Sequence, residues 1–174
     1  MTYWIEKAKQ LGFDTAVSVD PRSLLPREDV RAMCADNKCG AYNKNWTCPP
    51  AVGTLEECGQ RIARCRSALL LQTVGHMRKT IDSRCCLETE RRHTENLRTL
   101  AGELRREYPE ALCLGAGGCR RCGQCAYPEP CPFPGEALSS MEAYGLFVTQ
   151  VCRDAGVPYH HGERTVTYTA CILF

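Results

Sequence analysis

Four cysteines near residue 120 have the spacing of ligands that meet at one metal centre. Cys119, Cys122 and Cys125 are separated from one another by two residues, and Cys131 follows after a spacer of five residues. A turn with two residues between ligands lets three thiolates converge on three irons of a cubane cluster. The spacing therefore predicts an iron–sulfur centre in the loop over residues 119–135.

The chemistry of this cysteine row leaves two alternatives open. Bacterial ferredoxins use the same C-x2-C-x2-C row, but their following Cys-Pro comes after three residues and ligates the other cluster. The longer spacer here allows Cys131 either to close the same cluster or to reach a second one. Four thiolates also suit zinc, although zinc sites usually show two separated C-x2-C pairs. The row therefore favours a [4Fe-4S] cluster, with zinc as the alternative.

A second cysteine-rich loop, over residues 34–50, predicts a weaker site. Cys34, Cys39 and Cys48 lie in a polar stretch with no apolar period, and two prolines follow Cys48. Three thiolates can hold a cubane and leave one iron open to a substrate, which suits Lewis-acid or sulfur-transfer chemistry. The alternative is that Trp46 packs in the core and the three thiols are buried apolar groups. The candidates for a missing fourth ligand are a small molecule and the thiols of Cys131, Cys113 and Cys58.

The composition limits the classes of protein to which the chain can belong. Its 174 residues are 44% apolar and 24% charged, as in a globular domain and unlike a disordered chain. A net charge of +2 lacks the basic excess that a nucleic-acid groove or a polybasic membrane anchor needs. No apolar stretch is long enough for a transmembrane helix. Charges interrupt the first ten residues, so we expect no signal peptide, a reducing cytoplasm, and clustered thiols bound to metal.

The elements that must position these loops alternate between strand and helix patterns. This alternation predicts an α/β fold: a single domain over residues 1–174 in which a small sheet is covered by helices. The capping boxes Thr54-x-x-Glu57 and Ser139-x-x-Glu142 each predict the start of a helix. The expected helical segments are 2–11, 27–33, 54–64, 83–108 and 139–155. The expected strands are 16–19, 67–74, 111–114 and 165–174.

The remaining side chains with possible chemistry have simpler interpretations. Six cysteines are expected to be core or structural residues: Cys58, Cys65, Cys85, Cys86, Cys152 and Cys171. The histidines are expected in exposed positions: His76, His93, His160 and His161. Three interpretations are open for Arg120 and Arg121: they raise the potential of a cluster, they dock an acidic partner, or they are solvated loop charges.

The two loops and the C-terminal part resemble an uncharacterised family of predicted metal-binding proteins. The segments that carry the resemblance are Gly117-Gly118-Cys119-x-x-Cys122-x-x-Cys125-Ala126-Tyr127-Pro128, Pro130-Cys131-x-x-Pro134, Ser140-Met141-Glu142-Ala143-x-Gly145, the final Val166-Thr167-Tyr168, and Cys34, Cys39 and Asn45-Trp46-x-Cys48-Pro49-Pro50. The resemblance covers most of the chain and implies a cytoplasmic metal or iron–sulfur protein of anaerobic or facultative microbes. It implies no established reaction. Cys113 and Cys171 stand where an apolar residue is expected, which argues against a ligand role for them.

Three functional hypotheses follow from these patterns. In the first, one or two [4Fe-4S] clusters carry electrons to or from a redox partner protein. In the second, an open-iron cluster in the first loop acts on a small-molecule substrate or a sulfur species. In the third, zinc holds together a structural scaffold. The sequence shows no Walker loop, dinucleotide fingerprint or serine-nucleophile motif, and it leaves open whether the protein is an enzyme. We expect neither a nucleic-acid nor a membrane partner.

Overall fold

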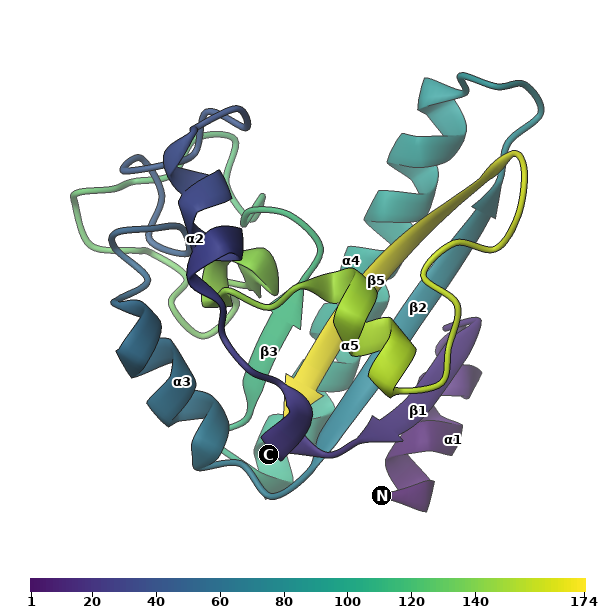
Figure 1. Cartoon of the computed structure of the whole chain (residues 1–174), viewed down its shortest axis with the longest axis horizontal. Helices are drawn as coiled ribbons and strands as arrows, with labels where there is room; N and C mark the ends of the chain where they lie inside the picture. Colours follow the sequence, from purple (N-terminus) through teal and green to yellow (C-terminus); the bar gives the residue numbers. More distant parts are fainter.

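A five-stranded mixed sheet forms the centre of the molecule in the computed structural model, which describes residues 1–174 (Figure 1). Its strands are β1 (Thr15–Val19), β2 (Ala68–His76), β3 (Leu112–Gly115), β4 (Ser139–Ser140) and β5 (Thr165–Leu173). They lie in the order β1-β2-β5-β3-β4, and every neighbouring pair is antiparallel except β3 and β4. The central pair is in register over its whole length, from Ala68 opposite Leu173 to His76 opposite Thr165. The predicted α/β fold is confirmed.

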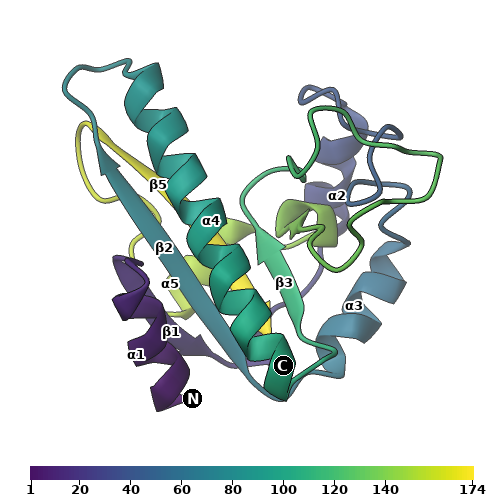
Figure 2. The same cartoon turned by 180° about the vertical axis from the view of Figure 1, so that it is seen from behind.

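Helices cover both faces of this sheet. On one face lie α1 (Thr2–Gln10) and α4 (Ser83–Glu107), which Figure 2 shows in front of the strands. On the other face lie α3 (Leu55–Ala63) and α5 (Val148–Asp154). The short α2 (Glu28–Ala35) packs instead against a 3-10 turn, η2 (Glu142–Tyr144). A second 3-10 turn, η1 (Pro21–Ser23), follows β1.

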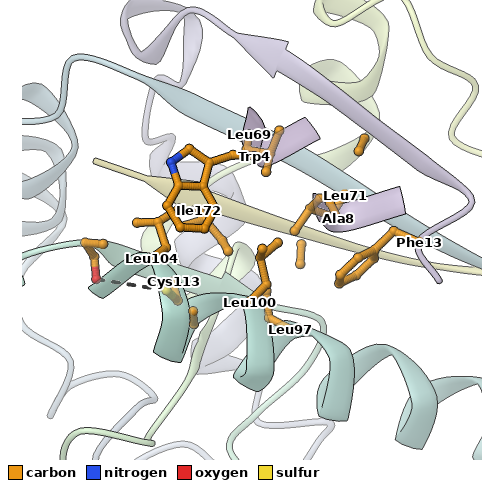
Figure 3. Close-up of a cluster of buried hydrophobic side chains, with 14 of the residues drawn as sticks. Trp4, Ala8, Phe13, Leu69, Leu71, Leu97, Leu100, Leu104, Cys113 and Ile172 are labelled. Atoms are coloured by element: carbon orange, nitrogen blue, oxygen red, sulfur yellow. Dashed lines mark hydrogen bonds between the residues drawn. The ribbon is translucent and has the colours of Figure 1, made fainter. Parts of the chain in front are cut away.

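The apolar run of β2 explains why this strand is central. Successive strand residues point to opposite faces, so a run that is apolar at every position needs cover on both sides of the sheet. Leu69 and Leu71 belong to the core cluster beneath α1 and α4, whereas Ala68 and Leu70 belong to the cluster beneath α3 and α5. Both layers of helices are therefore required to bury this one strand. Figure 3 shows the first cluster between α4 and the sheet.

The long helix α4 confirms one prediction and corrects another. It matches the segment expected to be helical, and Leu97, Leu100 and Leu104 are buried at a 3.6-residue period, whereas Tyr108 just past its end is exposed. His93, expected to be exposed, is 1% exposed: its Nδ1 lies 2.9 Å from the Thr73 hydroxyl, and its ring stands edge-on to Phe13. The prediction was wrong because it followed the charged neighbours of His93. The helical period places residue 93 on the same stripe as residues 97 and 100.

The two predicted capping boxes have different outcomes. Thr54 caps α3 as expected, because its hydroxyl accepts from the Glu57 N–H at 3.1 Å and the Glu57 carboxylate accepts from the Thr54 N–H. The box at Ser139 is wrong: Ser139–Ser140 is strand β4, and α5 begins only at Val148. Gly145 interrupts the helical path with a φ of +75°, where an added Cβ would lie 2.5 Å from a methyl group of Leu55.

Cysteines outside the two loops behave largely as core residues. Four of them are buried, namely Cys58, Cys113, Cys152 and Cys171, and three are half-buried, namely Cys65, Cys85 and Cys86. Burial raises the pKa of the Cys113 thiol to about 11, so this thiol is neutral at physiological pH. No helix of the fold combines the length and the apolar character needed to cross a membrane.

Candidate metal centre

The two cysteine-rich loops lie side by side at one edge of the molecule (Figures 1 and 2). The first connects α2 to α3, and the second connects β3 to β4. Neither contains a helix or strand over its cysteine-bearing part beyond the end of α2. Their shape is therefore set by turns and by side chains that join one loop to the other.

The four predicted ligands of the second loop border the same small cavity. Cys119, Cys122, Cys125 and Cys131 are all among the residues that line this cavity. All four thiols are half-buried. Asn45, Trp46 and Thr47 of the first loop line the same cavity, so both loops contribute to its wall.

Trp46 joins the loops through its indole. Its Nε1–H donates to the Glu129 carbonyl at 2.8 Å, and its ring stands nearly perpendicular to that of Tyr127, with centroids 5.0 Å apart. The Tyr127 hydroxyl donates in turn to the Asn43 side-chain oxygen at 3.0 Å. The alternative that Trp46 packs in the core is therefore wrong, because the indole is half-buried against the second loop.

The first loop has its three cysteines in three different environments. Cys39 is exposed, Cys34 is half-buried with its Sγ 3.9 Å from the Glu142 carbonyl oxygen, and Cys48 is buried. Burial raises the pKa of the Cys48 thiol to about 11, and the nearby thiols of Cys39, Cys34 and Cys119 add to that rise. A metal bound by Cys48 would therefore have to displace a proton from its thiol at neutral pH.

Two arginines outside the loops fix the chain that follows Cys48. Arg31 of α2 donates to the carbonyls of Gly53 and Ala143. Arg61 of α3 donates to the Val52 carbonyl at 2.7 Å and to the Tyr144 hydroxyl at 3.2 Å. Sequence reasoning missed both residues, because a lone arginine in an amphipathic helix gives no signal of a contact so far along the chain.

The structure shows where the three cysteines lie that were considered as a fourth ligand for the first loop. Cys113 lies in the core cluster beneath α4, Cys58 is buried on α3, and Cys131 lines the cavity of the second loop. Among the second-loop cysteines, Cys119 is near enough to Cys48 to contribute to the raised pKa of its thiol.

The two loop arginines point to different partners. Arg121 lines the cavity, with its guanidinium carbon 4.1 Å from the centroid of the Phe133 ring and its Nε 2.6 Å from the Glu136 carboxylate. Arg120 instead pairs with Glu90 of α4 at 3.1 Å. Only Arg121 therefore adds positive charge to the wall of the four-cysteine cavity.

The donor set of the second loop fits a soft metal centre. Four thiols on one cavity are the ligands that zinc and iron–sulfur clusters prefer. No three cysteine, histidine, aspartate or glutamate side chains are arranged around the position of a single ion. The arrangement is thus a shared cavity with thiols on its wall, and not a closed coordination shell.

Comparison with known proteins gives a match to one family model. No curated protein and no solved structure matches the chain. A family model described as "Predicted metal-binding protein (DUF2284)" matches residues 17–174, a span that includes both cysteine-rich loops. By this match, the chain belongs to the DUF2284 family of predicted metal-binding proteins.

Proposed function

We propose that this protein is an iron–sulfur redox protein. In this proposal Cys119, Cys122, Cys125 and Cys131 hold a [4Fe-4S] cluster that exchanges single electrons with a partner protein. The observation that carries it is the lining of one cavity by all four cysteines. The C-x2-C-x2-C row supports a cluster over zinc, because zinc sites usually show two separated pairs.

Residues around the cavity would anchor such a cluster, limit its contact with water and influence its reduction potential. Four thiolates would anchor it, and the half-buried Trp46 and Ala126 in the cavity wall would limit the access of water, whereas Phe133 on the same wall is exposed. Gly117 takes a φ of +76°, which turns the chain sharply just before Cys119. Burial and nearby charge set the reduction potential of a bound cluster. A redox partner protein and a cytoplasmic location remain predictions of this proposal.

The first loop favours a second candidate function, an iron–sulfur enzyme with an open iron. Cys34, Cys39 and Cys48 would supply three thiolates. A cleft of about 300 Å³ lies between α2 and the turn at Pro49-Pro50, and its lining includes the chain neighbours of Cys34 and Cys48, Ala35 and Pro49. Arg31 and Tyr42 are among the residues that line this cleft. A small molecule that entered there would reach the edge of the first loop. This candidate predicts that an added thiol or substrate analogue perturbs the spectrum of the cluster.

The first test is the content of iron, acid-labile sulfide and zinc after strictly anoxic purification. We expect a brown protein with about four irons per cluster and a reversible one-electron reduction visible by electron paramagnetic resonance. Zinc without iron contradicts the proposal and supports the scaffold hypothesis. An iron centre that stays diamagnetic under a strong reductant contradicts electron transfer.

A matched pair of variants locates the cluster. Cys122→Ala removes a half-buried thiol from the cavity, and we expect it to lose the cluster of the second loop. Cys65→Ala removes a half-buried thiol at the end of α3, outside both loops, and we expect it to keep the iron of the parent protein. Equal iron in the two variants would place the cluster elsewhere.

A further inference from the structure

The two loops meet in a small contact that we call the junction, made of Asn45, Thr47, Cys48, Gly118 and Cys119. The backbone N–H of Cys119 donates to the Thr47 hydroxyl at 3.3 Å, and its carbonyl accepts from the Asn45 side-chain amide at 3.3 Å. Both polar backbone groups of a second-loop cysteine are thus held by first-loop side chains.

The first-loop side of the junction is fixed by its own hydrogen bonds. Asn45 and Thr47 are 9% and 6% exposed, and the Asn45 side-chain oxygen accepts from both the N–H and the hydroxyl of Thr47 at 3.0 Å. Buried hydrogen bonds of this kind restrict the rotation of both side chains. The position of Cys119 therefore depends on the conformation of the first loop.

The junction also places a thiol of the first loop against the second. A Cβ added to Gly118 would lie 3.6 Å from the Sγ of Cys48. Cys48 follows Thr47 in the chain, and Cys119 follows Gly118, so one candidate ligand of each loop lies directly beside this contact. Three members of the junction, Asn45, Thr47 and Cys119, also line the four-cysteine cavity.

We infer that Cys34, Cys39 and Cys48 hold a second iron–sulfur cluster next to that of the second loop, and that the junction makes the two a single electron-transfer unit. This inference rests on the proposed function of the second loop. It assigns an iron–sulfur cluster to the first loop as well as to the second. It also gives the exposed Cys39 a role, as the ligand nearest to solvent at one end of the electron path.

The test is the resonance spectrum of the fully reduced, anoxically purified protein, together with its iron content. The wild type is expected to hold about eight irons and to show a signal broadened by the interaction of two neighbouring spins. Cys39→Ala changes an exposed residue, so its folding is at little risk, and we expect it to lose about half of the iron and to give the narrow signal of one cluster.

The possible outcomes separate this inference from the proposed function. Wild-type protein without iron contradicts both. About four irons, lost in Cys122→Ala and retained in Cys39→Ala, support the proposed function and contradict the inference. About eight irons with two signals that do not interact contradict the single unit.

A second variant probes the junction without removing a ligand. Thr47→Val keeps the shape of the side chain and removes the hydroxyl that Cys119 N–H uses, so we expect the spectrum of the second-loop cluster to shift at unchanged iron content. Thr99→Val on α4 removes a hydroxyl that bonds to the Glu95 carbonyl and is the control, with no shift expected. An identical spectrum in both variants would contradict the role of the junction.

Discussion

Cysteine occupies two regions of this molecule that differ in what surrounds the sulfur. Cys152 of α5 and Cys171 of β5 are 0% exposed in the core between that helix and the sheet, where burial raises the pKa of both thiols. Cys122 and Cys125 are half-buried on a cavity whose wall is built from irregular backbone. The comparison teaches that cysteine acts as a small apolar group where regular structure covers it. Where turns leave the sulfurs on a shared cavity, it offers ligands.

The two regions also differ in what holds them together. The sheet is joined by long backbone ladders and is covered by two apolar clusters of fifteen buried residues each. The loops are joined by a few side-chain bonds, of which those of Trp46 and Thr47 are central. We therefore expect the core to fold without metal and the loops to depend on it.

The largest expected effect is on stability, from the cavity that truncating a buried leucine would create in the core. Leu100 is 0% exposed between α4 and the sheet, so Leu100→Ala should lower the free energy of unfolding by about 2–5 kcal/mol. Because this site is outside the loops, the iron bound per folded chain should not change. Chemical denaturation and iron analysis of the same samples check both statements. A loss of iron in the folded variant would mean that core and loops are one cooperative unit.

A smaller effect is expected from the buried histidine. Burial, with the charge of Arg92 as a lesser cause, lowers the pKa of His93 to about 4, from an ordinary value near 6.5. Its ring faces Thr73, Phe13 and Tyr168, and its Nε2 has no hydrogen-bond partner. The unfolded chain takes up a proton below about pH 6.5, whereas the folded chain does so only near pH 4.

The sign of the pH effect follows from this difference. The contribution of His93 is fully present above pH 6.5 and is lost as the pH falls toward 4, by at most about 3 kcal/mol. In His93→Gln this part of the pH dependence should disappear, as measured by denaturation at pH 7 and at pH 5. An unchanged difference between the two pH values would show that other groups cause it.

Much of the core, and less of the loops, was predictable from the sequence. The strand at Ala68 and the long helix at Ser83 follow from local periods, and both are confirmed. Local patterns failed at Ser139, where pairing with β3 overrides a capping signal, and at His93, where the period outweighs the charged neighbours. Tertiary packing decided both cases.

The candidate site also has a part that could be predicted from residues close in sequence and a part that depends on contacts between distant residues. The row from Cys119 to Cys131 is local: its spacing can be read within one segment, and the four cysteines line one cavity. The contact of Trp46 with Tyr127, and that of Thr47 with Cys119, join residues more than seventy positions apart. No periodicity within one segment reports such a pair, so the closure of the cavity by the first loop was not predictable.

The smallest expected effect distinguishes the two arginines of the second loop. Arg121 lines the cavity, and its charge favours the reduced form of a bound cluster, which carries one more electron. Arg121→Gln should therefore make the midpoint potential more negative, and Glu136→Gln, which removes the paired carboxylate, should make it more positive. Since both side chains are partly open to water, we expect shifts below ~59 mV, a tenfold change in a one-electron equilibrium.

Arg120→Gln is the matched control for this measurement, because Arg120 pairs with Glu90 on α4 and does not line the cavity. A redox titration of the three variants under anoxic conditions should thus give shifts of opposite sign for Arg121→Gln and Glu136→Gln and none for Arg120→Gln. Equal shifts in the two arginine variants would mean that the cluster responds to the total charge of the loop and not to the cavity wall. The core and the loops would then differ only in where their cysteines lie, because the residues next to the loop cysteines would have no measurable effect on the midpoint potential of the cluster.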